Sequence, residues 1–355
     1  MHMPRRSTVM IKIIPCATAF LAAVALLAGC GGETGPTVSD RSVVFVGTGG
    51  AYQAAQREAF VKPFAASSGI KVVEDQPVTY AKLKTMVDSG RVTWDVVEAD
   101  PFYAIANCGR YIEKIDLTVV DVSKIDKELV SECGVPDMKS AFLLVYNTEK
   151  FGQNPPTSWR DFFDTKKFPG KRGMMNDAKE GGLEISLVAD GVPTDKLYPI
   201  DYTRAFRKLD TIRNDLKFFT TGAEQQQAME TGQVDMVLAW PGRASQAAHN
   251  GAKIAPVWNQ PMFFWDVLVV PKGTAHKTEA MKFIAHAITP AAQATLTQHI
   301  AYAPIHPDAK LPADEVTRQY LPLGQDKGTG FLRNMSWWAQ NLDTATQKWT
   351  AWISR

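Results

Sequence analysis

The chain has 355 residues, which is more than a single hydrophobic core usually supports, so we expect two lobes. Hydrophobic residues make up 45% of it and charged residues 21%, a balance that excludes a disordered chain, a collagen-like chain and a protein that crosses the membrane many times. The formal net charge of +2 lacks the basic excess of most nucleic-acid-binding proteins, so we expect no nucleic-acid partner.

Residues 1–29 have the features of an export signal. Arg5, Arg6 and Lys12 precede an apolar run over 13–27, which is short for a membrane-spanning helix. The run ends in Leu27-Ala28-Gly29-Cys30, which resembles the lipobox of bacterial lipoproteins. The resemblance implies that Cys30 carries a lipid, becomes the first mature residue and provides the only link to the membrane.

The alternative to a lipoprotein is a plain cleavable signal that happens to contain Cys30. In either case residues 30–41, which are rich in Gly, Thr and Ser, are expected to form a flexible tether. Export also bears on the two remaining mature cysteines, Cys108 and Cys133. An even pair in an oxidising compartment favours a disulfide, and two unpaired buried thiols are the alternative.

Apolar runs and helical periodicity alternate along the chain, which predicts an α/β fold. The expected strands are 42–46, 70–74, 95–98, 140–146, 172–175, 218–219, 234–239 and 263–270. The expected helices are 51–65, 80–89, 102–107, 202–213, 223–231, 278–287, 290–298 and 331–353, with a turn that leads into a helix over 155–163.

Common catalytic and cofactor-binding motifs are missing from the sequence. Residues 47–52 begin like a dinucleotide fingerprint, but Tyr52 stands where the third glycine would be. The sequence contains no Walker A, His-Glu-x-x-His, Cys-x-x-Cys or Gly-x-Ser-x-Gly pattern. We therefore expect a binding protein without catalytic residues, cofactor or metal.

Four segments resemble, in their order and spacing, the extracellular solute-binding proteins of ABC importers, and within them the spermidine/putrescine-binding subfamily. The segments are 158–163 with 167–172, then 177–180, then 237–242, and finally 263–266 with 300–304. The resemblance covers most of the chain from about residue 42 onward. It implies a monomer whose partners are a small-molecule solute and the permease subunits.

The same resemblance implies a two-lobed periplasmic-binding-protein fold of type II, with a ligand cleft between lobes that crossover strands join. Crossovers are expected near 140–146 and 263–270, with a third crossing after Pro304. The expected first lobe is 42–144 with 267–305, and the second is 145–266 with 306–355.

Polyamine-binding relatives hold ammonium groups with carboxylates and flank the methylene chain with aromatic rings. A buried ammonium needs a paired charge, and a ring face beside it adds about 0.5–2 kcal/mol. The positions that match this pattern or face the expected cleft are the acidic Asp266, Asp177, Glu180 and Asp100 and the aromatic Trp240, Phe264, Tyr302 and Tyr52. Alternatives remain for three of them: a helix cap for Asp177, a solvated face for Glu180 and a core position for Trp240.

Two features depart from the polyamine pattern. The loop at 47–52 exposes glycine N–H groups, which suit an anion. Arg243 follows the segment 237–242 at the start of an expected helix, where it either holds a carboxylate in bidentate fashion or is an ordinary surface arginine. The main hypothesis is a binding protein for a polyamine such as putrescine or spermidine. The alternative is an amino-carboxylate such as 4-aminobutyrate or another small anion, and a sensor subunit or an enzyme on this fold is a third interpretation.

The lipobox resemblance can be tested by changing its cysteine. Cys30→Ser should leave the protein unprocessed at the lipoprotein site and should alter its partitioning between membrane and soluble fractions. Mass spectrometry of the native protein should find lipid on Cys30. An unmodified N-terminus at another residue would contradict this expectation.

Overall fold

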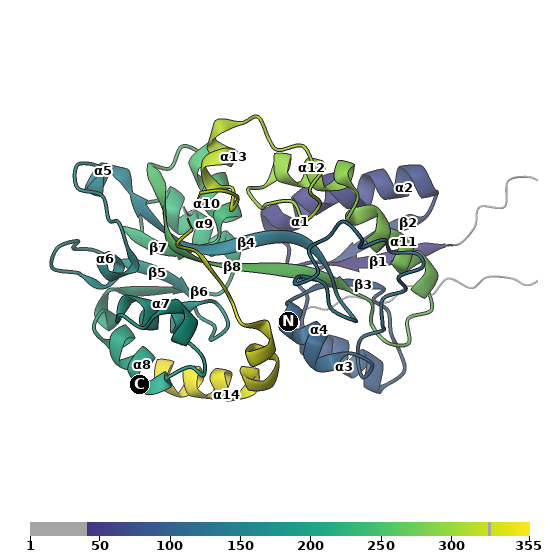
Figure 1. Ribbon diagram of the computed structural model, residues 1–355, viewed down its shortest axis with the longest axis horizontal. Helices are drawn as coiled ribbons and strands as arrows, with labels where there is room; N and C mark the ends of the chain where they lie inside the picture. Colours follow the sequence, from purple (N-terminus) through teal and green to yellow (C-terminus); the bar gives the residue numbers. More distant parts are fainter. Residues whose placement is uncertain (1–40, 326–327) are drawn as a thin grey trace, which may run out of the picture. The chain divides into compact units, whose positions relative to one another are not determined.

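The structure is a computed structural model that describes residues 41–325 and 328–355 (Figure 1). The described residues form one compact unit around a mixed sheet with the strand order β2-β1-β3-β8-β4-β7-β5-β6, and β9 pairs with β8. The predicted α/β class is therefore confirmed. The signal, the tether up to residue 40 and the lipidation site Cys30 lie outside the described residues, and the predicted lobe bounds stay a prediction.

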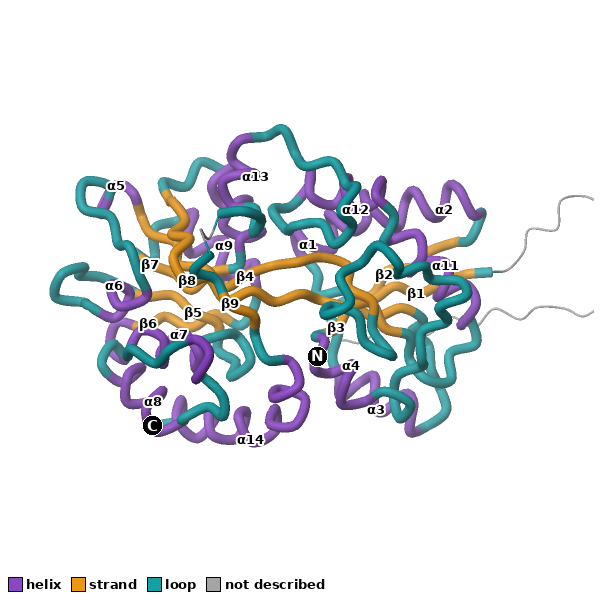
Figure 2. Tube along the Cα trace, viewed as in Figure 1, coloured by secondary structure: helices purple, strands orange, loops and turns teal. Residues whose placement is uncertain are grey.

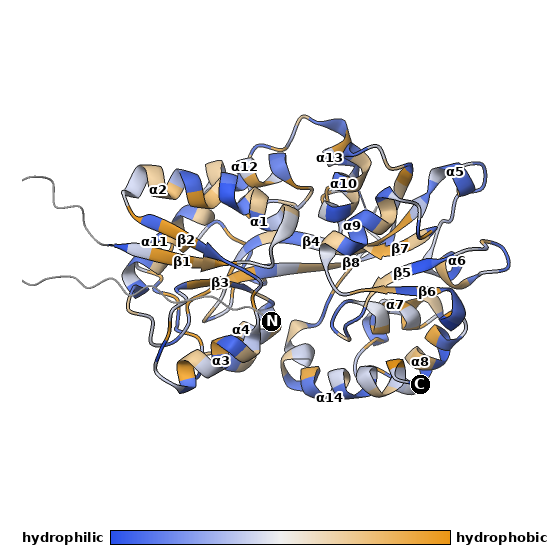
Figure 3. Ribbon diagram, turned by 180° about the vertical axis from the view of Figure 1, so that it is seen from behind, coloured by the Kyte–Doolittle hydropathy of each residue, from blue (hydrophilic) through white to orange (hydrophobic). Residues whose placement is uncertain are grey.

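One half of the sheet comes from the first hundred residues of the chain. Its parallel strands are β1 (Ser42–Val46), β2 (Lys71–Asp75) and β3 (Val96–Ala99). Its helices are α1 (Gly50–Gln56), α2 (Lys62–Ser68), α3 (Tyr80–Asp88) and α4 (Pro101–Asn107), and the π-helical turn Arg57–Val61 joins α1 to α2. The apolar side chains of β3 and most of those of β1 are buried, with Val44 only partly so, and both strands are coloured mainly as hydrophobic in Figure 3.

The other half of the sheet repeats this strand and helix alternation. Its parallel strands are β5 (Arg172–Met175), β6 (Leu216–Phe219) and β7 (Met236–Ala239). Its helices are α5 (Thr148–Phe151), α6 (Trp159–Phe163), α7 (Gly182–Ala189), α8 (Tyr202–Asp210), α9 (Gly222–Glu230) and α10 (Pro241–His249). A capping box between Thr221 and Glu224 fixes the start of α9.

Two long antiparallel strands, β4 (Val135–Asn147) and β8 (Ile254–Val269), belong to both halves. β8 pairs with β3 at one end, β4 pairs with β7 at the other, and the two strands pair with each other along most of their length. Figures 1 and 2 show them running through the middle of the sheet between the two groups of helices. The short segments expected at 140–146 and 263–270 are thus parts of much longer strands.

The C-terminal part of the chain adds helices and one short strand. The elements are α11 (Lys277–Ala287), α12 (Pro290–His299), α13 (Glu315–Tyr320), β9 (Phe331–Leu332) and α14 (Met335–Ile353). The expectation of one helix over 331–353 was wrong at its start. Phe331 and Leu332 pair with β8 as a strand, and the side chain of Asn334 then caps α14 by accepting a bond from the Trp337 N–H.

The tryptophans of α14 pack inward rather than facing solvent. Trp338 and Trp352 are fully buried, and the ring of Trp352 stacks on Phe206 of α8 at 5.4 Å. The ring of Trp338 lies 6.2 Å from Phe102 of α4, so α14 contacts both halves. Among the described residues, no helix combines the length and apolar character needed to cross a membrane.

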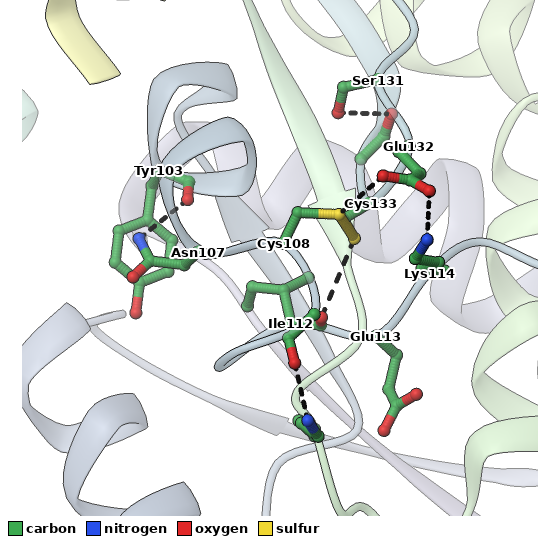
Figure 4. The surroundings of a disulfide bond; sticks show 12 residues. Tyr103, Asn107, Cys108, Ile112, Glu113, Lys114, Ser131, Glu132 and Cys133 are labelled. Carbon is green, nitrogen blue, oxygen red and sulfur yellow. Dashed lines mark hydrogen bonds and ion pairs between the residues drawn. A yellow bond between two sulfur atoms is a disulfide. The ribbon is translucent and has the colours of Figure 1, made fainter. Parts of the chain in front are cut away.

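Cys108 and Cys133 form the expected disulfide (Figure 4). It joins the residue after α4 to the segment just before β4, and the two Cα atoms are 5.4 Å apart. An ion pair between Lys114 and Glu132 lies next to it, and Cys133 is buried. The bond therefore closes the loop of 25 sequence positions that leads from the first half of the sheet into β4.

Removing this bond should destabilise the fold. Closing a loop of this length restricts the unfolded chain by about 3 kcal/mol. The double variant Cys108→Ala/Cys133→Ala should lose about that amount of unfolding free energy in urea under non-reducing conditions. The wild type measured with a reductant is the matched control and should approach the variant, whereas equal midpoints for oxidised wild type and variant would contradict the prediction.

Candidate functional site

A cavity of about 490 Å³ lies where the two halves of the sheet meet. The segments that follow β1, β2, β3, β5, β6 and β7 supply much of its wall, because the carboxyl ends of parallel strands gather at one edge of a sheet, and residues of β4 and β8 also line it. All nine side chains predicted for ligand contact line it: Tyr52, Asp100, Asp177, Glu180, Trp240, Arg243, Phe264, Asp266 and Tyr302. Their roles toward a ligand remain predictions, but the structure brings them together.

An acidic group, here called the acid cluster, consists of Glu98 on β3, Asp266 on β8 and Asp137 on β4. Glu98 and Asp266 line the cavity, and Asp137 is fully buried among the elements that form it. The register between β4 and β8 shifts at Asp137, which is the kind of irregularity that redirects a side chain. The Tyr52 hydroxyl and the Gln56 amide donate to Asp137 Oδ2 at 2.9 and 3.0 Å.

The acid cluster has fewer donors than it has oxygens. Glu98 Oε2 and Asp137 Oδ1 are buried and have no hydrogen-bond partner in the structure. Burial, and then the nearby Asp137, raise the pKa of Glu98 to about 8. Burial also raises the pKa of Asp137 to about 6, although the bonds from Tyr52 and Gln56 oppose this. Burial, and then the charges of Glu98 and Asp100, raise the pKa of Asp266 as well.

Burial is the largest cause of all three raised pKa values, and none of the ion pairs among the described residues includes these carboxyl groups, although the charge of Lys179 partly opposes the rise at Asp266. Such a group ionises fully only when a positive charge joins it. The acid cluster is therefore suited to an ammonium group supplied from the cavity.

Arg243 lies in the first turn of α10 and is only 4% exposed. Its Nη2 donates to the carbonyl of Gly49 at 3.2 Å, and its Nε is buried without a partner. None of the ion pairs among the described residues includes Arg243. A Cβ added at Gly222 would lie 2.5 Å from Nε, so a glycine is needed where the chain passes the guanidinium.

A second acidic group consists of Asp100, Asp177 and Glu180, and it surrounds Lys179. The Lys179 ammonium lies 2.6 Å from Glu180 Oε1 and 3.3 Å from Asp100 Oδ2. Asp100 also accepts a bond of 2.7 Å from the Tyr80 hydroxyl. Asp177 accepts from the Lys179 backbone N–H at 3.1 Å, which is a local turn rather than a helix cap. Unlike the acid cluster, this second acidic group already has a cation.

Aromatic rings form the apolar part of the wall. Phe264 stacks on Phe142 with 4.5 Å between ring centroids, and Tyr302 meets Tyr52 edge to face at 4.9 Å. Trp240 is half-buried at the end of β7, lining the cavity and packing on the core. Trp265 is buried and does not line the cavity, as the alternation along β8 predicts.

Sequence reasoning missed three charged residues of the cavity wall. Glu98 precedes Asp100 by two positions in an otherwise apolar strand, which was a usable signal. Lys179 lies in the segment 177–180 beside two of the predicted ligand-binding acids, Asp177 and Glu180. Arg333 gave no signal, because it is an isolated arginine before α14. It is buried 4.4 Å above the Trp338 ring and 3.5 Å from Glu184. No group of metal-ligating side chains occurs among the residues described.

Comparison with known proteins identifies the family. Residues 59–320 match the bacterial extracellular solute-binding proteins. The chain belongs to this family. It is therefore a non-enzymatic solute-binding protein of an ABC importer that works outside the cytoplasm, as predicted, while attachment by a lipid stays a prediction.

Three similar proteins show how closely the chain resembles characterised or solved members of the family. The chain is 33% identical over 324 residues to the gamma-aminobutyric acid-binding protein of Pseudomonas aeruginosa, which covers 89% of this chain and 92% of the relative. A solved GABA receptor is 39% identical with a TM-score of 0.81, covering 88% and 97% of the two chains. An ABC transporter substrate-binding protein from Bradyrhizobium japonicum is 34% identical with a TM-score of 0.82, covering 88% and 100%. These matches support the predicted periplasmic-binding-protein fold, and none of their names supports the polyamine-binding subfamily.

The acid cluster predicts how stability changes with pH in the ligand-free protein. The pKa of Glu98 is raised to about 8 in the fold and is about 4.3 in an unfolded chain, so the folded state holds the extra proton between these values. Ionising Glu98 as the pH rises from about 5 to 8 should therefore lower the unfolding free energy. Glu98→Gln removes this contribution, so its unfolding free energy relative to that of wild type should increase by roughly 3 to 4 kcal/mol between pH 5 and pH 8. Parallel pH profiles from urea denaturation would contradict the prediction.

Proposed function

We propose that the protein captures 4-aminobutyrate, or an ω-amino acid of similar length, in this cavity and delivers it to an ABC permease. The observation that carries the proposal is Arg243, a buried guanidinium in the cavity wall without a carboxylate partner among the described residues. The acid cluster offers the opposite charge in the same cavity. A solute with one ammonium and one carboxylate satisfies both.

The ammonium of the solute would join Glu98 and Asp266. Both line the cavity, and Glu98 Oε2 is a buried acceptor with no donor. An ammonium supplies three N–H donors and a positive charge, so it would satisfy this oxygen and favour the ionised state of the acid cluster. Tyr52 and Gln56 keep Asp137 in place by donating to it from α1.

The carboxylate of the solute would join Arg243. The unpartnered Nε and the rest of the fork suit two parallel bonds to a carboxylate, which is the strong form of this contact. Thr220, Thr221 and Gly222 line the cavity at the start of α9, and Trp240 does so at the start of α10. The positive ends of these two helices add to the attraction for an anion.

The buried guanidinium of Arg243 also argues against a polyamine. A diamine long enough to reach from the acid cluster to Arg243 would bring its second ammonium to a buried guanidinium, and like charges repel strongly away from water. The polyamine hypothesis therefore has less support than its alternative, 4-aminobutyrate. The gamma-aminobutyric acid-binding protein and the GABA receptor among the relatives support that alternative.

The proposal is tested by calorimetry with three ligands of matched length. Wild-type protein should bind 4-aminobutyrate and should bind butylamine and butyrate much more weakly, since each lacks one charged end. Arg243→Met should weaken 4-aminobutyrate by about 30-fold or more, because removing one partner of a desolvated charge pair costs about 2–5 kcal/mol. The same change should leave butylamine almost unaffected.

Asp266→Asn should show the mirror pattern, with a loss for 4-aminobutyrate and butylamine and little change for butyrate. Arg207→Met, which removes an exposed arginine on α8, is the matched control and should keep wild-type affinity. Tight binding of 1,4-diaminobutane together with no binding of 4-aminobutyrate by the wild type would contradict the proposal.

A further inference from the structure

Lys179 occupies the middle of the second acidic group. Its ammonium contacts Glu180 and Asp100, and the Tyr80 hydroxyl donates to the same Asp100 oxygen. Asp100 follows β3 and Lys179 follows β5, so the contact joins the two halves of the sheet across the cavity. The protein therefore places an ammonium of its own where the wall is most acidic outside the acid cluster.

Lys179 stays charged in this position. Burial alone would lower its pKa, but the carboxylates of Asp100, Glu180 and Asp177 outweigh burial and hold the pKa well above its usual value. The Lys179 side chain is only 25% exposed, and the Asp100 side chain is 17% exposed. Because these side chains are largely buried, dissolved salt weakens the attraction between their charges only a little.

The two acidic groups of the cavity differ in this respect. The acid cluster contains two buried oxygens without a donor, whereas Lys179 contacts both Asp100 and Glu180 and the Tyr80 hydroxyl also donates to Asp100. One ammonium site is thus left to the solute, and the other is filled by the chain. A diamine needs two open ammonium sites, and the described residues of this cavity offer only the one in the acid cluster.

We propose that Lys179 is a specificity-determining residue, a tethered ammonium that fills a second amine subsite formed by Asp100, Asp177 and Glu180 and so excludes diamines. This inference rests on the proposed function only in assigning the acid cluster to the amine of the solute. It explains how a cavity with five acidic side chains in its wall can select a solute with a single positive charge.

The test removes the tethered ammonium and offers a free one. Lys179→Met leaves Asp100 and Glu180 without a cation, so 1,4-diaminobutane, which is close in length to 4-aminobutyrate, should bind at least about tenfold more tightly than it binds wild type. Lys179→Gln keeps N–H donors for the same carboxylates and should show a smaller gain of the same sign. The second variant serves if the first does not fold.

Two further variants separate specificity from general charge effects. Lys179→Met combined with Asp100→Asn removes the acceptor as well and should cancel the gain in diamine affinity. Lys62→Met removes an exposed lysine that pairs with Glu58 on the surface and should not change diamine affinity. A gain in both Lys179→Met and Lys62→Met would show a general effect of net charge and would overturn the proposal.

The inference also fails if a folded Lys179 variant binds 1,4-diaminobutane no more tightly than wild type does. The diamine measurement stands by itself, so it tests Lys179 whether or not 4-aminobutyrate binds. Wild-type protein that binds 4-aminobutyrate, with no diamine gain in either Lys179 variant, would retain the proposed function and reject only the role of Lys179.

Discussion

The structure depends on placing two buried carboxyl groups, Glu98 and Asp137, and the half-buried Asp266 at the junction of β3, β4 and β8. Glu98, Asp137 and Asp266 come from three adjacent strands, so the sheet itself holds them together. Unpaired buried charge costs far more free energy than one hydrogen bond returns. The fold reduces this cost with the Tyr52 and Gln56 donors and with protonation, and leaves the remainder to whatever cation enters the cavity.

The same constraint accounts for the long strands. β4 and β8 run through both halves of the sheet, and they carry two of the three acids at the place where the halves meet. A charge brought to this junction therefore acts on residues fixed in a shared ladder of backbone hydrogen bonds. Arg243 and Lys179 reach toward the first half from loops and helices of the second, and each makes a polar contact across the cavity, to Gly49 and Asp100 respectively. The charges of the protein, and those of a bound ligand, are therefore located at the junction between the two halves of the sheet.

The sequence predicted the strands well because most of them are short apolar runs bounded by turns, as in β1 and β7. It did not reveal α7, since every residue from Gly182 to Ala189 is buried and the helix has no polar face to produce a periodic pattern. It also placed the start of α14 too early, because pairing of Phe331 with β8 is a tertiary effect. Positions that follow a strand were predictable as cavity positions, whereas Arg333 reaches the wall from a segment with no local signal.

The pairing of each charged residue depends on the fold more than on its motif. The acids of the segment 177–180 match the pattern of partners for a ligand amine, but in the structure the cation that contacts Glu180 is Lys179 of the same segment. Arg333 and Arg243 are both buried arginines of one cavity, yet the first lies beside Glu184 and the second has no such neighbour among the described residues. The proposed solute class rests on the charges that the protein leaves unpaired, which is a property of the folded arrangement and not of any single motif. By that criterion one negative group and one guanidinium remain, and they match an amino-carboxylate better than a polyamine.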